Sequence, residues 1–349
     1  MKKIIKLLVV AFFAYAVWFY FSYEAAVNKP LDAKGQAKVF TVKKGQAVSA
    51  VGIALKEQKL VSSDLFFKLY AYQSKQEKSF KAGSYEISPA MTVKEIVKKI
   101  SLGQVIGEEI DRQIIEGWTR RDLAKKISEW GMGQEADFYK LVGEPMKECS
   151  LKSPTSKDYS TQFDFLADKP ACRGLEGYLF PDTYRLYKNA SADDLVLKML
   201  QNFDRKLTSE MRAEIKRQGK TIYEIVTMAS VIQKEVTSEA DMKVVSGIFW
   251  NRLKSGQGLE SCATLAYILG VNKDIYSLDD TQIDSPYNTY RNNGLPVGPI
   301  SNPGFQAINA AIYPDKTDYY YFLSRPDTGE TVFSKTFEEH IRNKNKYLK

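Results

Sequence analysis

The strongest feature of the hydropathy pattern is an apolar run near the N-terminus, Leu7 to Tyr23, which carries no charge and ends at Glu24. Its length is at the short end of the roughly 17–25 residues that cross a bilayer. Three lysines precede it, and lysines on that side favour a cytoplasmic N-terminus. The pattern therefore predicts a transmembrane anchor over residues 1–24, with the rest of the chain outside the cytoplasmic (inner) membrane.

The same run has a second interpretation as a cleaved secretory leader. Ala14-Tyr15-Ala16 matches the small-residue pattern of a cleavage site. Cleavage there would leave the apolar segment Val17–Phe21 at the mature N-terminus, so the anchor is the favoured interpretation. Both interpretations place the remaining chain outside the cytoplasm. Residues 25–37 are polar and carry proline and glycine, and we expect them to form a linker.

A strand–turn–helix pattern recurs three times after the linker. In each copy a short apolar run precedes a turn, and the following segment repeats its apolar residues at helical spacing. Thr92 and Glu95 form a capping box at the start of the second helix, where each side chain satisfies a free backbone N–H. An additional helix is predicted for Asp64–Gln73. The predicted strand–helix pairs are 39–42 with 48–55, 84–87 with 93–100, and 113–115 with 120–127.

One segment, Thr221 to Val236, combines a helical pattern with a candidate catalytic side chain. At about 100° per residue, Glu235 points within about 20° of Met228, on the apolar face of its own helix. Burial disfavours the charged form of a carboxyl group and raises its pKa, as a general acid requires. The alternative is that the helix ends near Glu235 and the carboxylate simply reaches solvent.

The segments around this helix are also predicted to be helical. Ser238 and Asp241 form a start signal for a helix over Glu239–Lys254, which would meet the preceding helix close to Glu235. Residues 202–220 are charged and amphipathic and are expected to form one surface helix.

Two segments combine tyrosines with hydrogen-bonding side chains. Residues 285–303 are dense in Pro, Gly and Asn, which predicts ordered loops. Rings stack on the apolar faces of sugars while amides and hydroxyls bind their edges, so these segments are candidates for sugar binding. A tyrosine-rich structural loop is the alternative. The candidate residues are Tyr287, Asn288, Thr289 and Tyr290 in the later segment, and Glu176 and Tyr178 in Leu175–Tyr184.

Composition narrows the classes of partner and cofactor. A net charge of +8 and a pI near 9.0 suit anionic envelope polymers or lipid head groups, although an ordinary basic surface gives the same values. The sequence has no clustered basic stripe, so nucleic acid is not an expected partner. One histidine and three scattered cysteines argue against a zinc site, and no cofactor is expected. Cys149 and Cys172 flank a polar loop and are candidates for a disulfide, which the sequence leaves open.

Four landmarks in order give the chain a family resemblance: the N-terminal anchor, LEGYLFPDTY from Leu175, ASVIQKE ending at Glu235, and SPYNTYRNNGLPVGPISNPG from Ser285. With them the chain resembles the YceG-like endolytic murein transglycosylases over roughly residues 40–349. The resemblance implies an α+β protein with the N-terminal transmembrane helix, a small LysM-like strand–helix domain (38–105) and a larger mixed α+β catalytic domain (106–349).

The resemblance also implies the chemistry and the site. Such enzymes cut the MurNAc–GlcNAc bond of peptidoglycan glycan strands and leave 1,6-anhydro-MurNAc ends, beside wall-synthesis enzymes such as penicillin-binding proteins. The catalytic acid maps to Glu235, and Gln233, where many relatives carry a second Glu, becomes its hydrogen-bonding neighbour. Thr264 lies in a segment (TLAYILG) similar to one in the family, and Ser261-Cys262-Ala263 departs from a more usual Asp-Pro-containing run.

Three alternatives to this function stay open at the level of sequence. A conventional glycoside hydrolase would pair Glu235 with a second carboxylate, for which Glu176, Glu239 and Asp284 are candidates. A non-catalytic scaffold would bind strands and leave them intact. A cysteine hydrolase would need Cys262 and His340 together, which nothing in the sequence requires.

Overall fold

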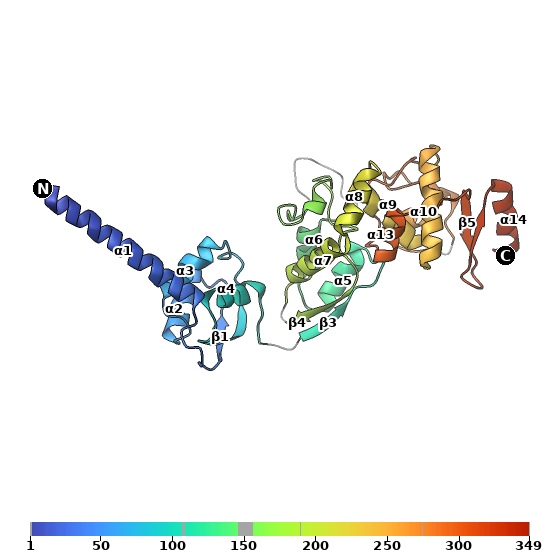
Figure 1. The fold of residues 1–349 in the computed structure, drawn as a ribbon. Coiled ribbons are helices and arrows are strands. Elements are labelled where there is room, and N and C mark those ends of the chain that lie inside the picture. Colours follow the sequence, from blue (N-terminus) through green and yellow to red (C-terminus); the bar gives the residue numbers. More distant parts are fainter. Residues whose placement is uncertain (1, 107–108, 146–155, 189, 274, 349) are drawn as a thin grey trace. The chain divides into compact units, whose positions relative to one another are not determined.

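The computed structural model describes residues 2–106, 109–145, 156–188, 190–273 and 275–348. The chain divides into two compact units, one of Met1–Ile110 with Leu186–Ala190 and the other of Asp111–Arg185 with Ser191–Lys349 (Figure 1). The predicted α+β class is confirmed, since helices and short strands occur together in both units.

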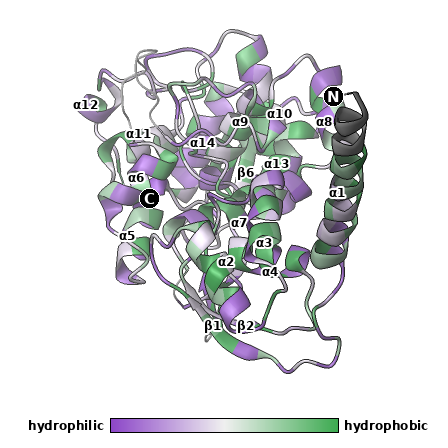
Figure 2. Ribbon diagram, turned by 90° about the vertical axis from the view of Figure 1, so that its left-hand side faces the viewer, coloured by the Kyte–Doolittle hydropathy of each residue, from purple (hydrophilic) through white to green (hydrophobic). Residues whose placement is uncertain are grey.

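The first unit begins with a single long helix, α1 (Lys2–Asn28). Its stretch Val10–Asn28 is long and apolar enough to cross a membrane, and 6% of the most apolar window is buried inside the protein. Large apolar side chains such as Phe13 and Trp18 are exposed along it. Figure 2 shows the hydropathy of the chain along its ribbon, with α1 labelled. The apolar run thus forms a helix that is uncovered over residues 10–18, while its C-terminal end packs against α3 and α4.

The rest of the first unit is a small strand–helix domain. Strands β1 (Lys38–Val42) and β2 (Gly83–Ile87) pair antiparallel, with Lys38 opposite Ile87. Their buried side chains pack with apolar residues of the helices into one core that includes Phe40, Phe67 and Tyr85. The helices are α2 (Val48–Glu57), α3 (Asp64–Gln73) and α4 (Val93–Leu102).

Local signals placed these elements well. The capping box of Thr92 and Glu95 is present at the start of α4, and α3 has the predicted bounds because Ser63 accepts a hydrogen bond from the backbone N–H of Phe66. The third predicted strand was wrong in position: β3 covers Glu109–Gln113 and ends where the prediction began. Its polar alternation concealed it from a search for apolar runs.

The second unit consists mainly of helices. Strands β5 (Tyr321–Ser324) and β6 (Thr331–Ser334) pair within it, and the residues of a second pair, β3 with β4 (Thr183–Tyr187), are divided between the two units. The helices are α5 (Arg120–Glu129), α6 (Glu135–Val142), η1 (Asp164–Leu166), α7 (Ala192–Lys206), α8 (Ser209–Arg217), α9 (Ile222–Glu235), α10 (Glu239–Lys254), α11 (Cys262–Leu269), α12 (Leu278–Thr281), α13 (Phe305–Ile312) and α14 (Phe337–Tyr347).

The single helix expected over 202–220 was wrong. The structure has two helices there, α7 and α8, separated at Leu207 and Thr208. Leu207 leaves the helical conformation, and the Thr208 side chain then accepts a hydrogen bond from the N–H of Met211. A threonine cap inside a continuous amphipathic pattern was the signal that the periodicity concealed.

Helix α9 lies at the centre of the second unit. Every residue from Ile225 to Ile232 is buried, because α8, α10, α11 and α13 all pack against this helix. A helix that is buried all round is held rigidly by its neighbours. The packing of α9 therefore fixes the position of its last residue, Glu235.

Candidate active site

Glu235 is the last residue of α9, and Val236 after it is extended. The helix ends here, as the alternative interpretation expected, yet the carboxylate does not simply reach solvent. Its side chain is half-buried, and its oxygen Oε1 accepts a hydrogen bond from the Ser261 hydroxyl. The backbone N–H of Ala263 donates to it as well.

Burial raises the pKa of Glu235 above its ordinary value. The Ser261 hydroxyl, the positive charge of Arg252 and the Ala263 N–H all favour the carboxylate and oppose this shift without cancelling it. A group that is more easily protonated than a free carboxyl, and that still has donors for its charged form, suits alternating acid and base roles.

Thr264 and Thr289 hold Ser261 in position. The Ser261 N–H donates to Thr289 Oγ1 at 3.1 Å, and Thr264 Oγ1 donates to the Ser261 carbonyl at 2.7 Å. The two threonine hydroxyls are 3.1 Å apart, and both side chains are buried. The structure therefore places these two predicted substrate contacts behind Ser261, where they position the serine.

Tyr290 and Cys262 lie close enough to Glu235 to interact with its charge, and both are more exposed than Ser261. The Tyr290 ring is half-buried, and its hydroxyl is 3.1 Å from the sulfur of Cys262. Cys262 is a free cysteine with an exposed residue surface, and partial desolvation of its sulfur raises the pKa of the thiol. A thiol that resists ionisation is poorly suited to nucleophilic catalysis, which argues against the cysteine hydrolase.

Arg252 supplies the positive charge near Glu235. Its guanidinium donates to the carbonyls of Tyr320 at 2.9 Å and Leu259 at 2.7 Å, and it lies 5.4 Å above the ring of Tyr321. The ring of His340 stacks on the same Tyr321 ring, with 5.4 Å between the two ring centres. The C-terminal elements β5 and α14 thus help to fix the cation beside the site.

Asn288 organises the tyrosine-rich loop. It is fully buried, and its amide donates to the carbonyls of Thr281 and Ile283, while its oxygen accepts the Tyr290 N–H at 3.0 Å. The Tyr287 ring is also buried, 5.1 Å from the ring of Tyr267. Of the four residues predicted for sugar binding in this loop, Tyr290 has the most exposed side chain.

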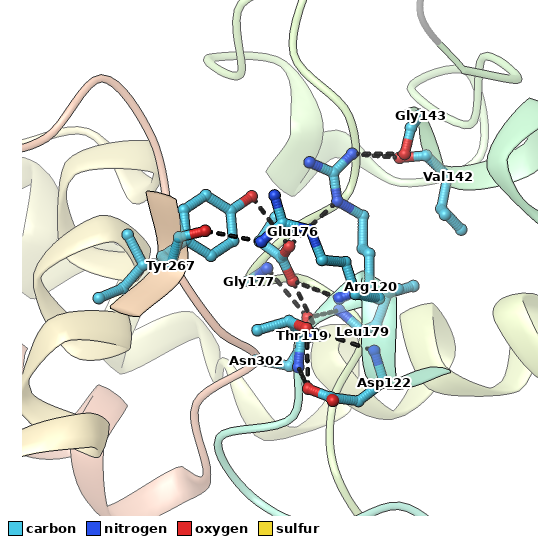
Figure 3. A network of polar contacts seen from close by, with 12 residues as sticks. Thr119, Arg120, Asp122, Val142, Gly143, Glu176, Gly177, Leu179, Tyr267 and Asn302 are labelled. Carbon is cyan, nitrogen blue, oxygen red and sulfur yellow. Dashed lines mark hydrogen bonds and ion pairs between the residues drawn. The ribbon is translucent and has the colours of Figure 1, made fainter. Parts of the chain in front are cut away.

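Glu176 belongs to a buried polar network behind the site (Figure 3). Its carboxylate pairs with Arg120 at 3.2 Å and accepts hydrogen bonds from Tyr267 at 3.1 Å and Asn302 at 3.2 Å. Burial raises the pKa of Glu176, and the Arg120 guanidinium opposes that shift. Arg120 also donates to the carbonyls of Val142 and Gly143 at 3.0 and 2.7 Å.

This arrangement gives Glu176 a structural role. Its oxygens are directed at partners inside the protein, as Figure 3 shows, and its side chain is closed to solvent. The other two candidates for a second catalytic carboxylate are exposed: Glu239 pairs with Lys243 at 3.0 Å, and the side chain of Asp284 is 98% exposed. None of the three makes a hydrogen bond to Glu235 within the described residues.

Tyr178 and Gln233 also face the interior. The Tyr178 ring is fully buried, 5.4 Å from Phe203 and 6.0 Å from Phe165. Gln233 Oε1 accepts the N–H of Gly304 at 2.8 Å, at the start of α13, so its hydrogen bond goes to that helix and not to Glu235. Both positions fit packing better than contact with a substrate.

A cavity of about 370 Å³ is lined by residues next to Glu235 in sequence and in space. It adjoins Glu235 through Lys234 and Ala263, and it is lined by both charged and apolar side chains. Among the described residues, no three His, Cys, Asp or Glu side chains come together in a way that would hold a metal ion. The lining includes Arg121, Asp122, Lys125, Glu135, Tyr139, Tyr267, Asn272 and Ile300.

Sequence reasoning missed Ser261, Arg252 and Arg120. Ser261 lies in the run that departs from the family pattern, and this departure was its only signal. Arg252 and Arg120 sit in helices whose exposed faces also carry arginine or lysine, and nothing local separates the buried ones. The possible Cys149–Cys172 pair includes a residue outside the described part of the chain.

Comparison with known proteins agrees with this site. The model of the YceG-like family matches residues 40–346. A Bacillus subtilis protein named endolytic murein transglycosylase is 32% identical, over 94% of this chain and 90% of its own length. A Streptococcus pneumoniae protein of the same name is 30% identical, and the chain spans 61% of that protein.

A solved structure supports the same relationship. The crystal structure of a putative yceG-like protein from Listeria monocytogenes shares 32% identity, covers 89% of this chain and 100% of its own, and superposes with a TM-score of 0.56. The family match, the two relatives and this structure extend over most of the chain, from the small strand–helix domain to the C-terminal helix. The chain belongs to the YceG-like family.

Proposed function

We propose that this protein is an endolytic murein transglycosylase that cuts glycan strands of peptidoglycan and uses Glu235 as its only acid/base group. The observation that carries the proposal is the environment of Glu235, a half-buried carboxyl with a raised pKa and two protein donors. The names of the B. subtilis and S. pneumoniae relatives give the substrate class.

One carboxyl group suffices for this reaction. Protonated Glu235 donates its proton to the oxygen that links MurNAc to GlcNAc, and the bond from that oxygen to the anomeric carbon breaks. The resulting carboxylate then takes the proton of the MurNAc C6 hydroxyl, whose oxygen forms the new bond to the anomeric carbon. The products are a free hydroxyl on one fragment and a 1,6-anhydro end on the other, with no water consumed.

Ser261 and the Ala263 N–H support the second half of this cycle. They donate to the carboxylate that exists after the first proton transfer, and burial favours the neutral acid that exists before it. The two opposing effects keep the free energies of both protonation states close, as a group that gives and retakes one proton requires.

The described residues place none of the three candidate carboxylates as a hydrogen-bonding partner of Glu235, and this favours transglycosylation over hydrolysis. A retaining hydrolase uses a second carboxyl group about 5 Å from the first, and an inverting one a wider pair. Here Glu176 forms a buried ion pair with Arg120, while the side chains of Glu239 and Asp284 are exposed. The arrangement favours a reaction in which the substrate supplies the nucleophile.

In this proposal the glycan strand contacts Tyr290 and the cavity beside Lys234. The half-buried Tyr290 ring offers an apolar surface to a sugar face. We also propose that α1 anchors the chain in the cytoplasmic membrane with its second unit outside, and that the small domain over 38–105 is LysM-like and binds glycan. Trimming of nascent strands beside penicillin-binding proteins follows from the family resemblance.

The test is a digest of purified peptidoglycan by the full chain in detergent micelles, with mass spectrometry of the products. We expect anhydro-ended fragments from the parent protein and none from Glu235→Gln. Reducing ends would assign a hydrolase, and intact strands from a folded parent would assign a scaffold. Equal activity of the Glu235→Gln variant would remove this residue from the mechanism.

A further inference from the structure

Helix α3 of the small domain packs directly against the outer part of the long apolar helix α1. The Phe66 ring lies 5.3 Å from that of Phe19 and 5.7 Å from that of Tyr23, both edge to face. The Tyr23 hydroxyl donates to Gln73 at the other end of α3. Two ring contacts and a hydrogen bond therefore fix α3 beside residues 19–23 of α1.

The depth of these contacts follows from helix geometry. The hydrocarbon core of a bilayer is about 30 Å thick and takes about 20 helical residues at 1.5 Å each. The uncharged run of α1 ends at Glu24, and Phe19 lies five residues, about 7.5 Å along the axis, before that charge. An anchor that spans the membrane therefore brings Phe19, and Phe66 with it, to the outer edge of the hydrocarbon.

A row of exposed apolar side chains continues from this contact along α3. Leu65, Leu69 and Tyr72 are 50%, 39% and 52% exposed, respectively. Their spacing of four and three residues puts them on one face of the helix, while the core side chains Phe67 and Ala71 occupy another. Isolated exposed apolar residues need no explanation, but a row that starts next to a membrane helix does.

The charges around this row suit a lipid surface. Lys68 is exposed and flanks the row, so its stem can lie on the apolar surface while its ammonium group reaches anionic head groups. The acidic residue at the start of α3, Asp64, is neutralised by Lys56 at 2.6 Å. Lys68 is positive and Asp64 is paired, so neither residue places an unpaired carboxylate against the membrane.

We propose that the face of α3 formed by Leu65, Leu69 and Tyr72 lies in the head-group region of the outer leaflet and docks the small domain on the membrane. The inference rests on the proposed anchoring by α1 and adds a second, peripheral contact with lipid. Such a contact fixes the small domain at the bilayer surface, so a glycan strand that it binds is held close to the membrane.

The experiment measures probe depth in the full chain reconstituted in vesicles of phosphatidylcholine and phosphatidylglycerol. Single cysteines at Leu69, Val17 or Glu86 carry an environment-sensitive fluorophore, in a background with the three native cysteines, Cys149, Cys172 and Cys262, replaced by serine. Glu86 is the matched control. It is exposed like Leu69 and belongs to the same small domain, but it lies on strand β2 and not on the proposed docking face of α3. Lipids with a spin label near the head group quench probes at that depth.

We expect strong quenching and a blue-shifted emission at Leu69, and neither at Glu86. Quenching at Val17 but not at Leu69 would overturn the docking and leave the anchor in place. If spin labels at no depth in the bilayer quench the probe at Val17, both the docking and the membrane anchor would be overturned. A probe at Leu69 that is blue-shifted but unquenched would show that protein covers this face, and would also overturn the proposal.

A second variant separates docking from folding. Leu65→Asn with Leu69→Asn leaves the core residues Phe67 and Ala71 unchanged, so the small domain keeps its packing. We expect a probe at Tyr72 to lose most of its quenching in this variant, while a probe at Val17 keeps its own. Unchanged quenching at Tyr72 would show that the apolar row does not hold the domain on the membrane.

Discussion

Removal of the Ser261 hydroxyl tests how the protein sets the pKa of its catalytic acid. In Ser261→Ala, Glu235 loses the side-chain donor that most strongly favours its charged form. Burial then raises the pKa with less opposition, from Arg252 and the Ala263 N–H alone. We therefore expect the pKa of Glu235 to rise further in this variant.

The size of the shift follows from the strength of the bond. A hydrogen bond to a charged group is worth about 1.5–3 kcal/mol, and one pKa unit corresponds to about 1.4 kcal/mol. Since the Glu235 side chain keeps some contact with solvent, which screens the interaction, the lower end applies. The expected shift is about one pKa unit upward.

The assay is the pH profile of kcat/KM for release of anhydro-ended fragments. The first step needs protonated Glu235, so activity is lost as pH rises through its pKa. A higher pKa moves this limb to higher pH, by about one unit in Ser261→Ala. Activity at the optimum should fall as well, because the carboxylate formed in the first step is less stabilised.

The control is Ser255→Ala. This serine caps α10, and its hydroxyl bonds the Arg252 carbonyl at 3.0 Å, without contact to Glu235. We expect its alkaline limb to stay in place. An unmoved or downward-shifted limb in Ser261→Ala would refute the argument that this hydroxyl stabilises the Glu235 carboxylate.

Three further substitutions test the packing around the site. Arg120→Met leaves the Glu176 carboxylate buried without its cation, and we expect the free energy of unfolding, from urea titration, to fall by about 3–5 kcal/mol. Tyr178→Phe removes a buried hydroxyl that has no hydrogen-bond partner in the described part of the chain, so stability should hold or rise and strand cleavage should continue; loss of cleavage would restore a substrate role for Tyr178. In Gly247→Ala the new Cβ would lie 2.2 Å from the Asp315 carbonyl oxygen, so the melting temperature should fall although alanine favours helices.

Helices with clear start signals were predicted with their correct bounds. The helices Asp64–Gln73 and Glu239–Lys254 match because Ser63 and Ser238 each cap the first turn, and such caps act within four residues of sequence. Where a cap lay inside a continuous amphipathic pattern, at Thr208, periodicity alone joined two helices into one. Local signals therefore decide the boundaries of helices better than the hydrophobic pattern does.

The surroundings of Glu235 lay beyond such local reasoning. Its donor Ser261 is 26 residues away, and Thr289, which holds Ser261, is a further 28 residues along the chain. No pattern within one segment indicates that three segments meet at one carboxylate. The helical phase of Glu235 predicted its place on the apolar face of its own helix, because phase depends on that helix alone, and the structure has its side chain half-buried there.

The residues that suggested sugar binding are needed first for folding. Irregular segments leave backbone N–H and C=O groups without the partners that helices and strands supply, and buried ones must be satisfied by side chains. Asn288 does this for the tyrosine-rich loop, and Asn302 does it for the Leu175–Tyr184 segment by accepting the N–H groups of Gly177 and Leu179 at 2.9 and 3.0 Å. Because the same Asn- and Tyr-rich composition serves both purposes, exposure separates them, and it leaves Tyr290 as the ring in this loop best placed to meet a sugar.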